Sequence, residues 1–184
     1  MESYTRRDFW DSASKAGLAL GAVSIAYTMV SQMFTPEVIG KMGAGITTLI
    51  TMSLWVAKFA GCIWLMKFFL QKFAGISSDM TRNEVFKQGA AAAFLSALIF
   101  SAFYLAYVTI INPEAFNQAM DTAIESYSSF MDSNTSAMME EMRGKIPVIS
   151  FVSNLIYCSI YGSVLASILS RNIISDNPFE GYES

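Results

Sequence analysis

The sequence predicts an all-α, polytopic integral membrane protein with four transmembrane helices and an amphipathic external helical segment between the third and the fourth. Three observations predict this fold class. Hydrophobic residues make up 53% of the 184-residue chain and charged residues only 15%, whereas a soluble domain carries roughly 25% charged residues. Four apolar stretches are long enough for a transmembrane helix, which needs about 20 residues. A long polar stretch that is rich in acidic residues follows the third of them.

The chain is expected to form one membrane domain, whose segments follow from the alternation of apolar and polar stretches. In chain order they are a cytoplasmic interfacial segment (1–15), the first span (16–34), the second span (46–70), the third span (90–111), an external acidic segment (112–145), the fourth span (146–169) and a cytoplasmic tail (170–184). Only Lys58 and Lys67 interrupt the second span, and the fourth span contains no charged residue.

The N-terminal segment combines the basic pair Arg6-Arg7 with the aromatic pair Phe9-Trp10. Aromatic side chains favour the headgroup layer and basic ones the cytoplasmic side, so we expect this segment to lie at the inner interface. An arginine pair before an apolar run also resembles a twin-arginine export signal. No small-residue cleavage site follows the run, which favours a first span that remains part of the protein.

The distribution of Lys and Arg predicts the orientation in the membrane. Eight of these residues flank one set of span ends and three flank the other. Since cytoplasmic flanks carry the excess of positive charge, both termini and the connection between the second and third spans are predicted to be cytoplasmic. The eight are Arg6, Arg7, Lys15, Lys67, Lys72, Arg82, Lys87 and Arg171, and the three are Lys41, Arg143 and Lys145.

Small residues recur every four positions along three of the spans. The first span has Gly17 and Gly21, and the fourth has Gly162 and Ala166. In lipid, close packing of small residues promotes helix association. We expect these faces to pack within the bundle, with contact between two copies of the chain as the alternative. Other small residues at this spacing are Ala93, Ala97 and Ser101 in the third span and Ser159, Ser163 and Ser167 in the fourth.

Lys58 lies twelve residues from either end of the second span, which is roughly 18 Å from each end at 1.5 Å per residue. Its stem is too short to bring the ammonium group to an interface from that depth. A charged lysine there costs about 2.5–3.5 kcal/mol on insertion scales. None of the four spans contains an Asp or Glu, so we expect neutral partners within the chain.

Matching depths along the spans predicts a mid-membrane polar site. Its residues are Lys58, Tyr27, Thr28, Tyr104 and Tyr157, with Asn154 about one turn away. Three interpretations of the lysine remain open. It is neutral and hydrogen-bonded, it meets an anionic group of a partner protein, ligand or lipid, or it carries a proton along a transport path. Burial favours the neutral amine that the first and third interpretations need.

The external segment begins with a helix-start signal. Asn112 is a favoured cap, Pro113 suits the first helical position, and Glu114 suits the positive end of a helix. An amphipathic helix is predicted to follow, because apolar residues recur at helical spacing. Residues 133–135 are expected to end this helix, and a second helix is expected over 136–143. The apolar residues of the stripe are Phe116, Met120, Ile124, Tyr127 and Met131.

No catalytic or metal-binding pattern is found in the sequence. The chain has no His, which removes the commonest general acid or base and the commonest metal ligand. Cys62 and Cys158 each lie in an apolar run, which is typical of buried free thiols. We therefore expect no enzyme activity, no cofactor and no metal site. The net charge of −3 makes nucleic-acid binding unexpected as well.

Four short motifs make the chain resemble a bacterial family of small four-span inner-membrane proteins that is defined as a domain of unknown function. They are the glycines of the first span, Gly75-Ile76-Ser77, Ile111-Asn112-Pro113-Glu114, and the acidic, Met-containing stretch that leads to Gly162, Ala166 and Arg171. The resemblance covers roughly residues 15–171. It implies four helices in the bacterial inner (plasma) membrane and assigns no catalytic residues. Such proteins are often encoded near membrane-associated glycosyltransferases, which implies an accessory role in envelope assembly.

Two functions are consistent with these features. The first is a non-enzymatic accessory or scaffold subunit of a cell-envelope complex, which the small size, the small-residue faces and a tail with Phe179 and Tyr182 favour. The alternative is a small oligomeric transporter or lipid-handling protein that uses the polar layer around Lys58. In either case the chain lies in the lipid bilayer, and its expected contact is a membrane-protein partner or further copies of itself.

Overall fold

The computed structural model describes residues 5–32, 44–77, 80–127 and 133–174. Within these ranges the chain is helical and contains no strand, which confirms the predicted all-α fold class. Predictions that concern Lys41, Met131, Phe179 and Tyr182 fall outside the described residues. The helices are α1 (Arg6–Gln32), α3 (Ala44–Ala74), α4 (Arg82–Ala106) with its π-helical continuation η1 (Tyr107–Ile111), α5 (Pro113–Tyr127), α6 (Ser133–Arg143) and α7 (Ile146–Ile173).

Four helices of the described chain are long and apolar enough to cross a membrane, namely α1, α3, α4 together with η1, and α7. The predicted second, third and fourth spans lie wholly within α3, α4–η1 and α7, and the predicted first span lies in α1 as far as Gln32. The chain is therefore a multi-pass integral membrane protein.

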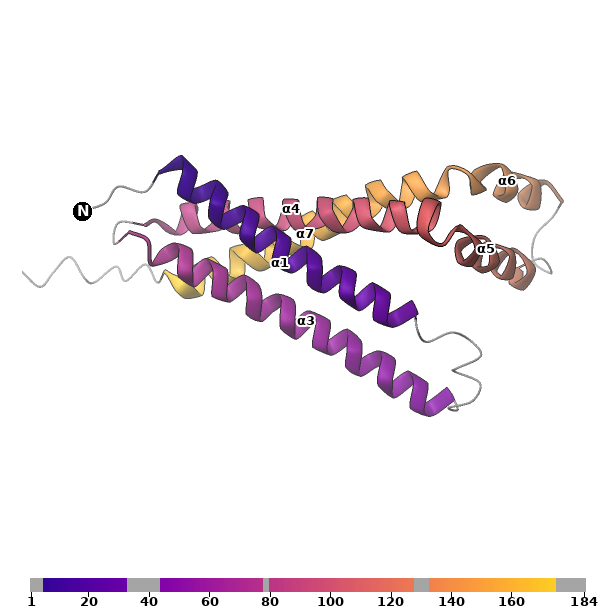
Figure 1. Cartoon of the computed structure of the whole chain (residues 1–184), viewed down its shortest axis with the longest axis horizontal. Helices are drawn as coiled ribbons and strands as arrows, with labels where there is room; N and C mark the ends of the chain where they lie inside the picture. Colours follow the sequence, from indigo (N-terminus) through magenta and orange to yellow (C-terminus); the bar gives the residue numbers. More distant parts are fainter. Residues whose placement is uncertain (1–4, 33–43, 78–79, 128–132, 175–184) are drawn as a thin grey trace, which may run out of the picture.

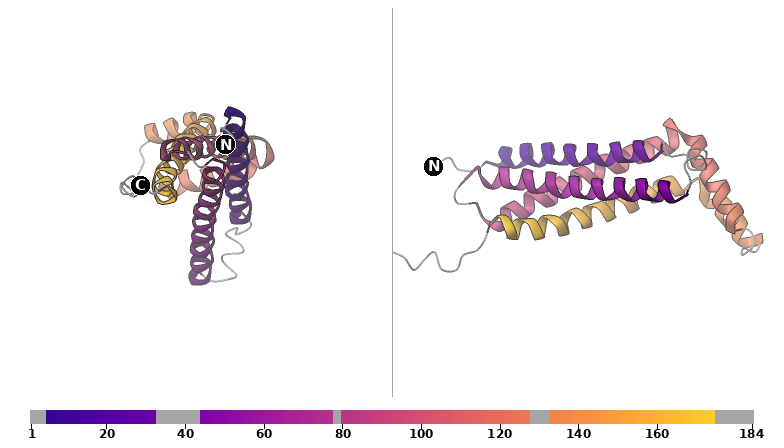
Figure 2. Two further views of the ribbon diagram at one scale, coloured as in Figure 1. Left: turned by 90° about the vertical axis from the view of Figure 1, so that its left-hand side faces the viewer. Right: turned by 90° about the horizontal axis from the view of Figure 1, so that it is seen from below.

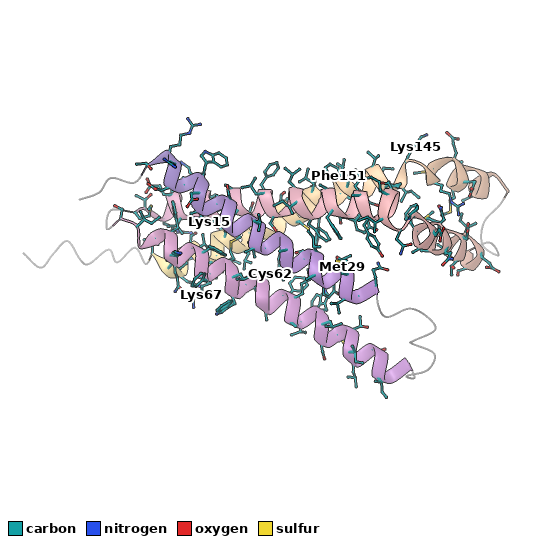
Figure 3. The ribbon with its side chains drawn as sticks, in the orientation of Figure 1. Lys15, Met29, Cys62, Lys67, Lys145 and Phe151 are labelled. Carbon is teal, nitrogen blue, oxygen red and sulfur yellow. The ribbon has the colours of Figure 1, made fainter. Side chains whose placement is uncertain are left out.

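The four long helices run alternately in opposite directions (Figures 1 and 2). The first turns of α1 and α4 and the last turns of α3 and α7 lie at one end of the bundle, which we call the terminal end. α5 and α6 lie beyond the opposite end, which we call the distal end. Lys15 and Lys67 lie toward the terminal end and Lys145 toward the distal end (Figure 3). Lysines that the sequence analysis assigns to opposite sides of the membrane thus lie toward opposite ends of the bundle.

Local capping explains where two of the helices begin. α4 starts at Arg82, well before the predicted span, because Thr81 and Glu84 form a capping box. The Glu84 N–H donates to Thr81 Oγ1 at 3.3 Å, and the Thr81 N–H donates to Glu84 Oε2 at 2.8 Å. Asn112 caps α5 as predicted, since its Oδ1 accepts from the Ala115 N–H at 3.2 Å.

One expectation for the external segment is wrong. α6 begins at Ser133, so residues 133–135 start a helix instead of ending one. The physical reason is that Ser and Asn, which disfavour helix interiors, are favoured at helix starts. The second helix of the segment is therefore three residues longer than predicted.

The terminal end holds the most tightly packed part of the bundle. Met66, Leu70 and Phe73 of α3 are at most 2% exposed there. They form one cluster with Val85 of α4 and Leu169 of α7, among other apolar residues. Large interlocking side chains therefore close the bundle at this end.

α4 is the central helix and packs along both α1 and α7. A Cβ atom at Gly162 of α7 would lie 2.5 Å from the Cβ of Ala93, and one at Gly17 of α1 would lie 2.7 Å from the Cβ of Leu95. Both positions require glycine because the helices approach so closely. These contacts confirm the prediction that the face with Gly17 and Gly21 and the face with Gly162 and Ala166 pack within the bundle. Ser167, on the other predicted face of the fourth span, is exposed.

α1 and α3 diverge from α4 and α7 toward the distal end, as Figure 1 and the left view of Figure 2 show. The first half of α3 is exposed as a result. Leu49 and Met52 are 67% and 63% exposed. The neighbouring pair Trp55 and Val56, which point to different sides of a helix, are 52% and 57% exposed. Packing within the described chain thus leaves this half of α3 largely uncovered.

Candidate functional site: a mid-membrane cavity around Lys58

Lys58 lies on α3, fourteen residues after Ala44 and sixteen before Ala74, which is about 21 and 24 Å from the two ends of the helix. Its side chain is partly buried. The Nζ atom lies 4.7 Å from the centroid of the Tyr27 ring of α1 and 5.6 Å from that of the Phe100 ring of α4. Both distances are within the range of a cation–π interaction.

The two rings stabilise the ammonium group but leave its hydrogen-bonding capacity unused. One cation–π contact contributes about 0.5–2 kcal/mol, depending on desolvation. Two of them approach the cost of about 2.5–3.5 kcal/mol for a charged lysine at mid-membrane. An ammonium group also carries three N–H donors. Among the described residues, Lys58 has no hydrogen-bond acceptor and no carboxylate partner.

A cavity of about 100 Å³ adjoins Lys58. A water molecule needs about 10–15 Å³ by the same measure, so the cavity has room for several. All four long helices line it, and Cys62, one of the lining residues, lies near the middle of α3 (Figure 3). Lys58 is the charged residue in the described lining, which includes no Asp or Glu. The other polar or sulfur-bearing lining residues are Ser24, Ser96, Tyr157, Tyr161, Cys62, Cys158 and Met66.

Helical periodicity explains how α3 supplies its share of the lining. Lys58, Cys62 and Met66 are spaced by four residues, so they lie on one face of the helix. Leu70 and Phe73 follow on α3 toward the terminal end, and both are fully buried. The cavity is therefore closed on its terminal side by the apolar cluster described above.

A row of aromatic rings borders the cavity between α3 and α7. The ring centroids of Trp55 and Phe59 are 4.3 Å apart, those of Phe59 and Tyr161 5.5 Å, and those of Tyr161 and Tyr157 6.5 Å. Tyr157 lines the cavity and is nevertheless 66% exposed. The Tyr157 ring therefore marks a side on which the cavity reaches the outside of the bundle, which we call the mouth of the cavity.

Two of the residues predicted to accompany Lys58 lie at its site in the structure, one in contact with it and one across the cavity. Tyr27 contacts the ammonium group with the face of its ring and not with its hydroxyl. Tyr157 lies across the cavity, on α7. The structure therefore brings parts of the first, second and fourth spans together at the level that the depth comparison indicated.

The other three predicted residues lie elsewhere. The Thr28 hydroxyl donates to the Ser24 carbonyl of its own helix at 3.0 Å. Tyr104 lines a second cavity, near the distal end, that also contacts Asn112. Asn154 does not line the cavity around Lys58. Depth along a helix places a residue at the correct level but leaves its direction around the helix axis open.

Several residues of the site were not predicted as site residues. Phe100 was missed because the prediction considered hydroxyl and amide partners for Lys58, whereas the structure supplies a ring face. Cys62 and Tyr161 follow Lys58 and Tyr157 by four residues, so helical periodicity could have identified them. Cys158 of α7 also lines the cavity. Both cysteines are free thiols.

Comparisons with known proteins identify a family and assign no activity. No curated protein and no solved structure matches the chain. Residues 15–171 match a family of unknown function, which confirms the predicted resemblance to such a family and its range. The match includes every residue that lines the cavity around Lys58. Because it covers most of the chain, the protein belongs to the family described as "Protein of unknown function (DUF4199)".

Proposed function

We propose that the protein is a non-enzymatic accessory or scaffold subunit of a cell-envelope complex in the bacterial inner membrane, with both termini in the cytoplasm. One observation carries the proposal. The bundle is closed by large side chains at its terminal end, whereas the distal half of α3 and the mouth of the Lys58 cavity are uncovered. A subunit that completes its packing with another protein would have this form.

The polar content of the uncovered side favours a protein partner over lipid. Exposed apolar residues such as Leu49 and Met52 suit lipid chains as well as another protein. Lipid chains, however, offer no hydrogen-bond acceptor in the hydrocarbon region. Among the described residues, the Lys58 ammonium group has no hydrogen-bond acceptor and the Tyr157 hydroxyl has no hydrogen-bond partner. A polypeptide that packs against the mouth could satisfy both groups.

The orientation rests on the positions of the basic residues. Lys15 and Lys67 lie toward the terminal end of the bundle, and the acidic external segment lies beyond the distal end (Figure 3). The excess of Lys and Arg at the terminal end favours a cytoplasmic location for that end. α5 and α6 then lie on the outer side of the membrane, where they are accessible to other envelope components.

The proposal is tested by isolating the full-length tagged protein from its own membrane in polymer-bounded nanodiscs, followed by native mass measurement and identification of bound proteins. An unrelated four-span protein with the same tag serves as the control. We expect one protein partner in a fixed ratio that is absent from the control. A chain that is recovered alone from the mildest extraction would contradict the accessory role.

The cavity itself favours a second function, that of a small oligomeric transporter or lipid-handling protein. The cavity around Lys58 lies at mid-membrane and has room for several water molecules, so a small solute can bind in it. Met66, Leu70 and Phe73 close it on the terminal side, so a path would need several copies of the chain around a shared opening. A homo-oligomer with bound lipid and no protein partner, found in the same experiment, would support this function.

A further inference from the structure

We propose that Lys58 pairs with an Asp or Glu carboxylate on a transmembrane helix of a different protein, which packs at the mouth of the cavity beside Tyr157. This inference rests on the accessory role proposed above and names the chemistry of the partner. It follows from the charge of the site, its depth, and the positions of the acidic residues in this chain.

The charge of the site calls for an anion from outside the chain. Lys58 is the charged residue in the described cavity lining. Among the described residues, its ammonium group contacts two ring faces and has no carboxylate partner. The rings of Tyr27 and Phe100 hold the cation in place, while its N–H donors stay available. A carboxylate accepts hydrogen bonds from such a donor and also carries the opposite charge, which makes these hydrogen bonds shorter and stronger than neutral ones.

A second copy of this chain does not place a carboxylate at the required depth with its described helices. Copies in one membrane share one orientation, so equivalent residues lie at equal depths. Phe100 marks the level of Lys58 on α4, and the nearest acids along that segment, Glu84 and Glu114, are sixteen and fourteen residues away. For Glu84, on the same helix, that corresponds to roughly 24 Å. Glu114 lies beyond the end of η1, in the first turn of α5.

The remaining long helices give the same result. On α1, Tyr27 marks the level of Lys58, and Asp11 is sixteen residues away. Neither α3 nor α7 contains an acidic residue. A homo-oligomer of the described helices therefore leaves the cation unpaired.

Depth also argues against a lipid headgroup as the anion. The hydrocarbon core is about 30 Å thick, so phosphate groups lie roughly 15 Å from its middle. Lys58 lies near the middle of its helix. A phospholipid would have to pull its phosphate into the hydrocarbon to reach it. A transmembrane helix can carry a carboxylate at that level, and such buried acids typically pair with a basic group.

The mouth of the cavity suits a helix as its occupant. Tyr161 and Tyr157, which line the cavity, are 37% and 66% exposed, and Trp55, at the end of the same row of rings, is 52% exposed. Large aromatic residues are the side chains that most often anchor protein interfaces. The Tyr157 hydroxyl has no hydrogen-bond partner among the described residues, so it offers a further polar group to a helix that packs there.

The test compares variants of the full-length tagged protein in the nanodisc isolation described above. Lys58→Met removes the charge and retains an apolar chain of similar length, and Lys58→Arg retains the charge. Lys67→Met is the matched control, because it removes a lysine from an exposed position on the same helix, outside the cavity. We expect Lys58→Met to recover at least tenfold less partner than the wild-type chain, and Lys58→Arg and Lys67→Met to recover a similar amount to it.

Two further measurements complete the test. The thermal unfolding midpoint of isolated Lys58→Met should equal that of the wild-type chain, which separates loss of binding from loss of folding. The partner should contain an Asp or Glu in the middle of a membrane span. Lys58→Glu should then lose the partner, and replacing that acid of the partner by Lys should restore the complex.

The outcomes separate this inference from the proposed function. A partner that Lys58→Met retains in full, or a partner whose spans contain no acidic residue, overturns the ion pair and leaves the accessory role intact. The same holds if the exchanged charges fail to restore the complex. Recovery of no partner by the wild-type chain overturns both. A homo-oligomer that depends on Lys58 would show that a second copy is the occupant, contrary to this proposal.

Discussion

The close approach of α4 and α7 gives the sharpest test of the packing. Replacing Gly162 with Ala would place a Cβ atom 2.5 Å from the Cβ of Ala93, whereas ordinary van der Waals contact begins near 3.4 Å. The Cβ of Ala93 is fixed to the backbone and has no rotamer that would move it away. The two helices must therefore separate by about 1 Å.

The expected loss of stability follows from two opposing contributions. Overpacking of a tight interface costs about 1–3 kcal/mol. Replacing Gly by Ala inside a helix gains up to about 1 kcal/mol in helix propensity. After subtraction of that gain, the free energy of unfolding of Gly162→Ala should fall by up to about 2 kcal/mol. Adding Ala93→Gly removes the opposing Cβ, so the double variant should be more stable than the sum of the single effects predicts, by about 1–2 kcal/mol.

The assay is reversible unfolding in micelles by a denaturing detergent, followed by circular dichroism at helix wavelengths. Gly61→Ala is the matched control, because a Cβ atom there would meet nothing within 4 Å. Its stability should be unchanged or slightly higher. The reasoning fails if Gly162→Ala is as stable as Gly61→Ala, or if the effects of Gly162→Ala and Ala93→Gly simply add.

Three further predictions concern the helix ends and the external segment. Thr81→Ala should lower the free energy of unfolding by about 1 kcal/mol through loss of the capping box, and Thr81→Ser should retain most of it; equal losses in the two variants would refute the role of the cap. The Asp121 carboxylate accepts a hydrogen bond from Arg143, which raises the pKa of that guanidinium and links α5 to α6. Asp121→Asn should therefore speed amide hydrogen exchange in α5 and α6 while leaving exchange in α4 and α7 unchanged, and faster exchange throughout would show that the pair supports the whole bundle. In a chain without its native cysteines, a membrane-impermeant maleimide should label Asn117→Cys in intact cells and Lys87→Cys only after permeabilisation, and the reverse pattern would overturn the orientation.

Much of the fold could be predicted because its signals are local. The lengths and hydropathy of the apolar stretches predict the four spans, and the start of α5 follows from Asn112 and Pro113. The early start of α4 also had a local signal, the Thr81 and Glu84 pair, which the prediction of the spans did not use. The intervals of four between Gly162 and Ala166 indicated a packing face, and the structure shows which helix covers it.

The candidate site was predicted only in part, because it depends on direction as well as depth. Tyr27 and Thr28 are neighbours at nearly the same depth, but successive side chains on a helix point about 100° apart. The Tyr27 ring consequently faces Lys58, whereas the Thr28 hydroxyl bonds to its own helix. Phe100 reaches the same ammonium group from a third helix. No pattern within one span contains this information.

The sequence by itself determined that the chain crosses the membrane four times and carries one lysine at mid-depth without an acidic residue at its level. Those properties follow from the free energy of transferring each segment into hydrocarbon, which depends on composition along the chain. Only the tertiary structure decided that this lysine lies beside a cavity, closed at the terminal end by Met66, Leu70 and Phe73 and bordered by exposed aromatic rings. Those properties depend on the angles at which the helices cross, which are set by contacts between side chains far apart in the sequence, such as that of Gly162 with Ala93.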